Sequence, residues 1–174
     1  MFWRQNNFFT ESERAWLTAT VTNFEQPSEH SHLVWIEIPI KNDGRTPARI
    51  KQIAVTNKLL PVPSSGWGRP GELPKEPDFS SDRTITLSGQ DIIVTPCGAL
   101  RHMHTYISPE EVKRINAREV SLYVYGFVEY LDTVKGKGHK TCFCSIYWVP
   151  EKGYNEPTGF MFSQIIPKAY FCAT

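Results

Sequence analysis

The densest run of β-branched and aromatic residues in the chain extends from Val120 to Asp132. Successive side chains of an extended segment point to opposite faces, so one face here is almost wholly apolar, with Val120, Leu122, Val124, Gly126, Val128 and Tyr130. The other face is aromatic with polar tips, with Ser121, Tyr123, Tyr125, Phe127 and Glu129. This pattern predicts a central strand that is covered on one face and half covered on the other. A hairpin loop at 133–140 and a second strong strand at 141–149 are expected to follow it.

Weaker alternation elsewhere predicts further strands at 15–24, 33–41, 45–56, 83–87, 91–95, 159–164 and 170–172. Asn42, Asp43 and Gly44 predict a tight turn, because these residue types tolerate the positive φ that a sharp reversal needs. A short helix is predicted to begin at Ser108 as its N-cap, with Pro109 at its first position, and to end near 116–118.

These elements predict an all-β fold, an immunoglobulin-like antiparallel β-sandwich with one short helix in a crossover. We expect a single domain at 15–174, preceded by a lead-in at 1–14 for which a helical turn is one interpretation. The predicted core consists of Trp16, Leu17, Val34, Ile36, Ile38, Ile50, Ile53, Leu122, Val124, Val128, Ile146 and Trp148.

A proline-rich loop at 57–81 is the least regular part of the chain. An irregular connection of this length is typically functional or mobile. Trp67 and Arg69 lie in it, and an exposed aromatic residue on a loop held by a rigid sandwich is a common recognition device. Trp67 would equally fit a lid folded back over the end of the sandwich. The loop is therefore one candidate surface for a protein partner.

Composition narrows the classes of function. The chain has 174 residues, 40% hydrophobic, with a formal net charge of +1. The hydrophobic content excludes wholesale disorder. The small net charge argues against a dedicated nucleic-acid binder. Lys135 and Lys137 form a basic hairpin tip, which we interpret as a second protein-binding candidate. No apolar run approaches the roughly 18 residues of a membrane span, so a cytoplasmic location is favoured for the chain as given.

Four cysteines and several histidines could carry metal or redox chemistry. His102, His104, His139, Cys142 and Cys144 are metal-ligand types, and residues two apart in a strand share a face. Burial of these cysteines as small hydrophobic residues is the favoured interpretation, because the spacing is not that of a structural zinc site. No cofactor is expected. The cysteine pattern favours reduced thiols, with a disulfide such as Cys97 to Cys144 as a separate alternative that only Cα distances decide.

Enzymatic motifs are missing from the sequence. There is no Gly-x-Ser-x-Gly nucleophile elbow, and the glycines at 66, 68 and 71 stand among prolines rather than before a helix. Glu110 and Glu111 are better explained by the positive end of the predicted helix than as an acid–base pair. We therefore expect a protein that is not an enzyme.

Four segments in this order resemble a family of uncharacterised bacterial proteins with an immunoglobulin-like sandwich domain. They are Glu-Arg-Ala-Trp-Leu at 13–17, Asn-Asp-Gly-Arg-Thr-Pro-Ala at 42–48, Tyr-Val-Tyr-Gly at 123–126 leading to Tyr-Leu-Asp at 130–132, and His-Lys-Thr-Cys-Phe-Cys at 139–144. Members usually carry one or two hydrophobic helices ahead of the domain. The resemblance implies a membrane tether if such an anchor has been removed from this chain, and it implies no reaction.

The function expected from the sequence is a non-enzymatic protein-interaction or accessory domain whose partner and oligomeric state are left open. The alternative is a metal-binding or redox-sensitive domain that uses the histidine and cysteine residues named above.

Overall fold

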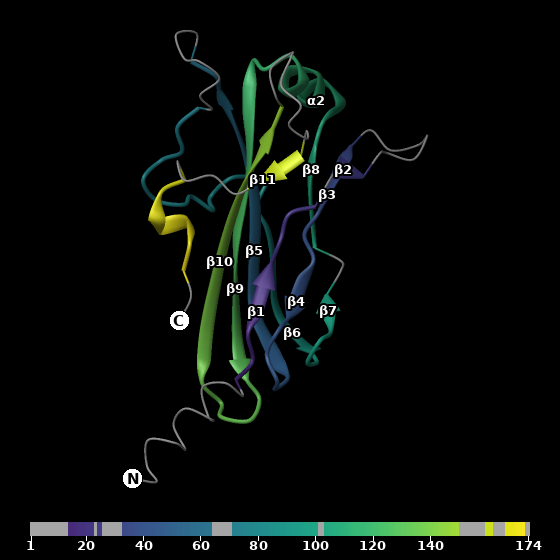
Figure 1. Ribbon diagram of the computed structural model, residues 1–174, viewed down its shortest axis with the longest axis vertical. Coiled ribbons are helices and arrows are strands. Elements are labelled where there is room, and N and C mark those ends of the chain that lie inside the picture. The colour runs from purple at the N-terminus through teal and green to yellow at the C-terminus, as the bar shows by residue number, and fades with distance from the viewer. Residues whose placement is uncertain are drawn as a thin grey trace.

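Two layers of antiparallel strands make up the protein (Figure 1). The computed structural model describes residues 14–22, 24–25, 33–63, 71–100, 103–149, 159–161 and 166–172, and the statements below refer to these residues. The described elements are β1 (Leu17–Ala19), β2 (Phe24–Glu25), β3 (Val34–Glu37), β4 (Ile40–Asn42), β5 (Ala48–Pro61), β6 (Ile85–Val94), β7 (Ala99–Leu100), β8 (His104–Ile107), α2 (Pro109–Asn116), β9 (Val120–Asp132), β10 (Gly138–Trp148), β11 (Gly159–Met161) and a 3₁₀ helix, η1 (Lys168–Tyr170). The fold is an all-β sandwich with a short helix in the crossover from β8 to β9.

One layer is a five-stranded sheet with the order β11-β10-β9-β5-β6, in which β9 is central as its alternation predicts. Its hairpin partner β10 pairs from Gly138 opposite Leu131 to Tyr147 opposite Leu122. On the other side of β9, the long strand β5 pairs antiparallel along its whole length. One extra residue between Ile50 and Gln52 makes a bulge in β5, which increases the local twist.

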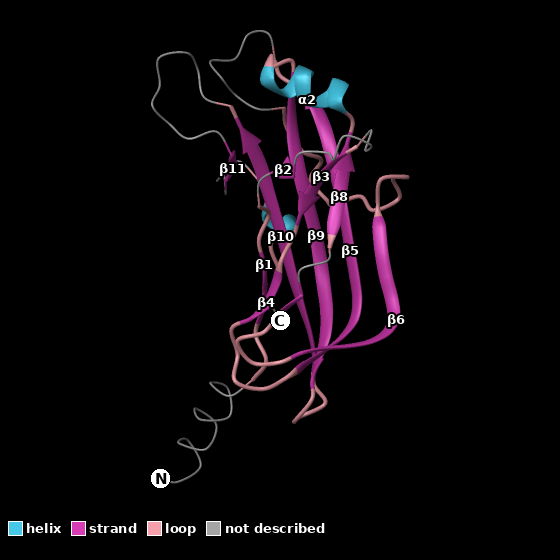
Figure 2. Cartoon of the chain, turned by 90° about the vertical axis from the view of Figure 1, so that its right-hand side faces the viewer, coloured by secondary structure: helices cyan, strands magenta, loops and turns pink. Residues whose placement is uncertain are grey.

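The other layer contains two three-stranded sheets, β1-β4-β7 and β2-β3-β8. The strand expected at 33–41 is divided into β3 and β4 at Ile38 and Pro39, because proline has no N–H to donate to a ladder. Backbone hydrogen bonds bridge the division, from the Thr20 N–H to the Pro39 carbonyl at 3.2 Å and from the Ile38 N–H to the Met103 carbonyl at 2.8 Å. The two sheets therefore continue into each other and cover one face of the five-stranded sheet (Figure 2).

The residues between the layers form the first core. Leu122, Val124 and Val128 of β9 are each fully buried there, as predicted. The same cluster contains Leu17, Val34, Ile36, Ile38, Ile50 and Ile53. Gly126 lies in this row because a Cβ would collide with the Ala54 carbonyl oxygen and come within 2.7 Å of the Phe143 ring.

Two residues of the predicted core lie elsewhere. Trp16 is 44% exposed, because Ala15 and Leu17 on either side of it turn inward at the start of β1 and leave Trp16 facing outward. The Arg14 guanidinium lies 4.3 Å above the Trp16 ring and shields one of its faces. Ile146 is buried, but on the opposite face of the five-stranded sheet, in a second core. The Trp148 side chain lies outside the described residues.

The irregular region expected at 57–81 is partly regular. Residues 57–61 continue β5, and residues 71–79 lie across the outer face of the five-stranded sheet. The two short strands expected at 83–87 and 91–95 are a single strand, β6, in which Gly89 has a φ of +73°. The last strand expected at 170–172 is not a strand, because Tyr170 ends η1 and residues 171–172 are irregular. No described helix has the length and apolar character needed to cross a membrane.

Candidate functional site

The outer face of the five-stranded sheet carries a cover made of two segments, 71–79 and 166–172. Aromatic residues of β9 hold the first of them. The Tyr123 hydroxyl donates to the Gly71 carbonyl at 2.8 Å, and the Tyr125 hydroxyl donates to the Asp78 carbonyl at 2.8 Å. The polar tips predicted for this face are therefore the points at which the cover is attached.

The second segment, 166–172, follows β11 in the chain and is joined to the sheet covalently. Cys172 forms a disulfide with Cys142 of β10, with 4.7 Å between their Cα atoms. Beside it, the Cys142 N–H donates to the Cys172 carbonyl at 2.8 Å. Tyr170 is 1% exposed and donates through its hydroxyl to the Glu76 carbonyl at 3.2 Å, so the two segments of the cover also touch each other.

Beneath the cover lies the second core, a cluster separate from the first one. Its buried members are Leu73, Tyr123, Tyr125, Cys144, Ile146, Ile166 and Tyr170. The rings of Tyr125 and Tyr170 meet edge to face with 5.0 Å between their centroids, an arrangement favoured by their quadrupoles. The five-stranded sheet is thus buried on both faces over this part of its length.

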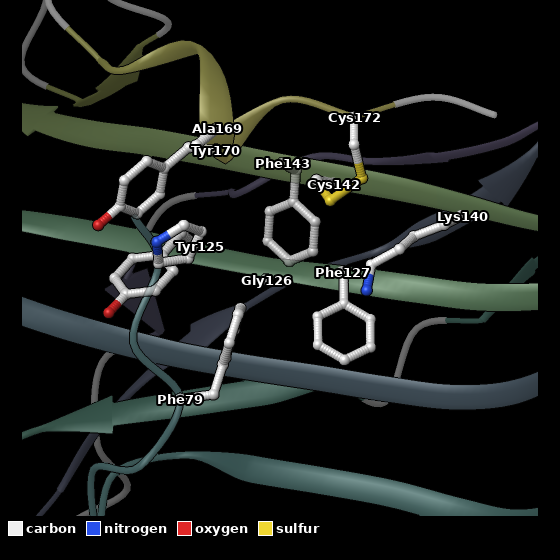
Figure 3. A pocket seen from close by; sticks show the side chains of 11 residues that line it. Phe79, Tyr125, Gly126, Phe127, Lys140, Cys142, Phe143, Ala169, Tyr170 and Cys172 are labelled. Carbon is white, nitrogen blue, oxygen red and sulfur yellow. A yellow bond between two sulfur atoms is a disulfide. The ribbon is translucent and has the colours of Figure 1, made fainter. Parts of the chain in front are cut away.

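An apolar pocket of about 260 Å³ lies between the two segments of the cover (Figure 3). One wall comes from Pro77 and Phe79 of the first segment, and the opposite wall comes from the second segment and its disulfide. The sheet between them supplies the floor. The lining residues are Pro77, Phe79, Tyr125, Gly126, Phe127, Lys140, Cys142, Phe143, Ala169, Tyr170 and Cys172.

The one charged side chain in the pocket lining, Lys140, is paired with a carboxylate outside the lining. At its rim the Lys140 ammonium lies 3.9 Å above the Phe127 ring and forms an ion pair with Glu129 at 2.9 Å. Burial raises the pKa of Tyr125 to about 12. Burial also raises the pKa of Tyr170. Both phenols therefore stay neutral at physiological pH.

The lining contains neither a carboxylate nor a histidine, and its cysteine sulfurs are joined in a disulfide. The neighbouring thiol of Cys144 is 3% exposed, and burial raises its pKa to about 12, so it is protonated near neutral pH. Such a site is suited to holding an apolar group, with the disulfide as its one redox-active element.

The two lysines that the sequence analysis proposed as a binding surface do not line this pocket. Lys135 and Lys137 are exposed on the loop between β9 and β10, next to Val134, which is 70% exposed. Trp67 and Arg69 lie outside the described residues. Sequence reasoning placed Tyr125 and Phe127 on the correct face of β9 but did not associate that face with a pocket.

Those proposed metal ligands that the structure describes are not brought together into one site. His139 is buried on the inner face of β10 with its ring 5.4 Å from that of Tyr130, whereas Cys142 and Cys144 occupy the outer face. His104 is in the other layer, with its ring 6.0 Å from that of Trp35. His102 lies outside the described residues. No group of three or more metal-ligand side chains occurs in the part of the chain that the structure describes.

The expectation of reduced cysteines is wrong for two of the four, and the Cys97–Cys144 alternative is also wrong. Cys142 pairs with Cys172, while Cys97 is an exposed thiol and Cys144 a buried one. Cys142 is therefore not available as a thiolate ligand in this form. The residues around Cys142 do not predict this pairing, because it depends on where a segment 30 residues later in the chain packs.

Comparisons with known proteins provide no functional assignment. No family model and no curated protein matches the chain. The chain is similar to a solved structure described as "Crystal structure of protein from Archaeoglobus fulgidus", with 10% identity and a TM-score of 0.38. The alignment covers 78% of this chain and 97% of that one. A similarity at this level supports no argument about function.

Proposed function

We propose that the protein is a non-enzymatic interaction domain that receives an apolar side chain of a protein partner in the pocket next to the Cys142–Cys172 disulfide. The observation that carries the proposal is the pocket itself, an open apolar hollow between the two segments that cover part of this sheet face. Apolar anchors that fill pockets supply much of the affinity of protein interfaces.

The charges at the site favour an uncharged anchor. Lys140 is paired with Glu129, so a ligand carboxylate would have to compete with that ion pair. The faces and edges of Phe79 and Phe127, which meet edge to face at 5.2 Å, suit an aromatic or branched aliphatic side chain. The proposed partner is therefore a peptide segment with one such residue, flanked by polar residues that remain at the rim.

The scaffold in this proposal is an immunoglobulin-like sandwich. The order β11-β10-β9-β5-β6 in one layer, facing β1-β4-β7 and β2-β3-β8 in the other, supports this assignment, because sandwiches of that class divide their strands between two antiparallel sheets in this manner. In such proteins the rigid sheets position a binding surface. Here that surface is on a sheet face rather than at the loops expected from the sequence.

The test is a selection of random peptides displayed on phage against the immobilised full chain. We expect enriched peptides to share one aromatic or branched aliphatic residue, and their affinity to fall by about tenfold or more in Ala169→Trp, which fills the pocket. Ala117→Trp is the matched control, because Ala117 is exposed at the C-cap of α2, away from the pocket. It should bind as the wild type does.

A second variant removes a wall instead of filling the space. Phe127→Ala should weaken the same peptides while leaving the folded spectrum unchanged, because Phe127 is only half buried. Enriched peptides that bind the wild type, Ala169→Trp and Phe127→Ala equally would show that the pocket is not the binding site. The absence of any enriched peptide would overturn the proposal as well.

A further inference from the structure

The segment 166–172 covers the second core without belonging to any described sheet. Its main contribution to burial comes from Ile166 and Tyr170, which are 5% and 1% exposed. Burial of two side chains offsets only part of the conformational entropy that is lost when seven residues are ordered. The disulfide reduces that loss, because it keeps the segment next to β10 whether or not the other contacts are formed.

The segment covers a free thiol, that of Cys144. Cys144 lies two residues from Cys142 on the same outer face of β10 and is buried with Tyr125 and Tyr170 in the second core. It is a free thiol at 3% exposure. Displacement of the segment would expose this thiol and the apolar residues around it.

The disulfide is itself accessible. Cys142 and Cys172 are both half buried, and both line the open pocket. Figure 3 shows their sulfur–sulfur bond at one end of the pocket, near Lys140. A thiolate from solution can therefore reach one of these sulfurs without prior unfolding of the sheet. Cys144 is a poor nucleophile toward this bond, because it is packed in the second core at 3% exposure and burial raises its pKa.

We propose that the Cys142–Cys172 disulfide is a redox-controlled clasp, which holds segment 166–172 over the second core and, when reduced, releases it and removes one wall of the pocket. The reductant is a dithiol. Its first thiolate attacks one sulfur of the clasp and forms a mixed disulfide, while the other cysteine leaves as a thiolate and takes up a proton. The second thiol of the reductant, as a thiolate, then attacks the reductant sulfur of the mixed disulfide, and the remaining cysteine leaves as a thiolate and takes up a proton. The products are two cysteine thiols in the protein and one disulfide in the reductant, a transfer of two electrons and two protons.

The consequence for binding rests on the proposed function. Ala169, Tyr170 and Cys172 all belong to the released segment and form one side of the pocket. The disulfide form is therefore the binding form, and reduction lowers the affinity for an apolar anchor. The opening of the clasp itself requires no ligand, so it can be tested separately.

The test uses the full chain with Cys97→Ser, so that Cys144 is the sole free thiol among the four cysteines in the disulfide form. The rate at which iodoacetamide labels Cys144 is measured by mass spectrometry in this protein and in the same chain with Cys142→Ser and Cys172→Ser added. We expect labelling about tenfold faster or more without the disulfide, since the segment then opens locally.

Hydrogen exchange distinguishes the clasp from a general stabilising bond. Without the disulfide, amides of 166–172 should lose protection while those in β9 and β5 retain it. Equal labelling rates with and without the disulfide would overturn the inference, and so would a loss of protection throughout β9. If Cys144 becomes reactive but no peptide ever binds, the result supports the redox-controlled clasp and contradicts the proposed function. If peptides bind both forms equally, the regulatory part of the inference is overturned.

Discussion

Asp132 shows how a single buried carboxylate joins distant parts of the chain. It accepts hydrogen bonds from the Ala15 N–H at 3.0 Å, the Thr46 hydroxyl at 3.0 Å and the Val134 N–H at 2.8 Å. The start of β1, the corner between β4 and β5 and the tip of the β9–β10 hairpin therefore meet at one side chain. Burial acts to raise the pKa of Asp132, but these hydrogen bonds outweigh it and hold the pKa below its usual 3.8.

Replacement of Asp132 by asparagine should test this junction. The amide presents an N–H₂ group to donors that need an acceptor, so we expect Asp132→Asn to lower the free energy of unfolding by about 2 kcal/mol near pH 7. Because the folded-state pKa is lowered, the carboxylate contributes its stability above its usual pKa of 3.8 and loses it as the pH falls through the folded value. The difference from the wild type in urea unfolding should shrink in that acidic range. Asp82→Asn, at an exposed position, should have little effect, and a pH-independent difference would contradict this role of Asp132.

At the scale of the element, α2 is specified by its own first turn. The Ser108 hydroxyl accepts from the Glu111 N–H at 3.2 Å, and the Glu111 carboxylate accepts from the Ser108 N–H at 2.8 Å, which completes a capping box. The same carboxylate forms an ion pair with Arg83 at 2.5 Å, and Arg83 also donates to the Asn57 amide oxygen at 3.1 Å. The cap therefore also attaches the helix to the segment before β6 and to β5.

Removal of the cap should lower the stability of the protein, and of α2 in particular, by a measurable amount. Ser108→Ala should lower the free energy of unfolding by about 1 kcal/mol, because the Glu111 N–H in the first turn of the helix loses the hydroxyl that accepts its hydrogen bond. Hydrogen exchange should show the largest loss of protection in α2. Ser88→Ala, at an exposed position of β6, is the matched control and should leave both measurements unchanged. An equal loss in the two variants would contradict the importance of the cap.

At the scale of the whole molecule, the protein has two apolar cores on opposite faces of one sheet. The first joins the two layers of strands, whereas the second lies under the cover formed by 71–79 and 166–172. The hydrogen-bonded ladders of β5, β9 and β10 border both cores, but the cover itself is not part of a described ladder. We therefore expect the cover to open more readily than the sandwich.

A pair of charge substitutions should separate the two cores. Leu122→Asp places a carboxylate at a fully buried position of the first core, and we expect loss of cooperative thermal unfolding. Leu73→Asp, at a position 9% exposed in the second core, should retain the far-ultraviolet circular dichroism of the sheets while the tyrosine signals in the near ultraviolet weaken. Ile93→Asp, at a position 57% exposed, should resemble the wild type. A folded Leu122→Asp protein would contradict the two-layer arrangement.

The sequence by itself determined the features that depend on neighbouring residues. The central strand at Val120–Asp132 and the helix that follows Ser108 agree with the structure, because alternation and capping act over a few residues. It also identified the aromatic face of β9 that supplies Tyr125 and Phe127 to the pocket. Only the tertiary structure decided the second core, the pairing of Cys142 with Cys172 and the walls of the pocket at Pro77 and Ala169. Each of these joins residues that are far apart in the chain, and which of many distant segments covers an apolar face is decided by packing of the whole fold.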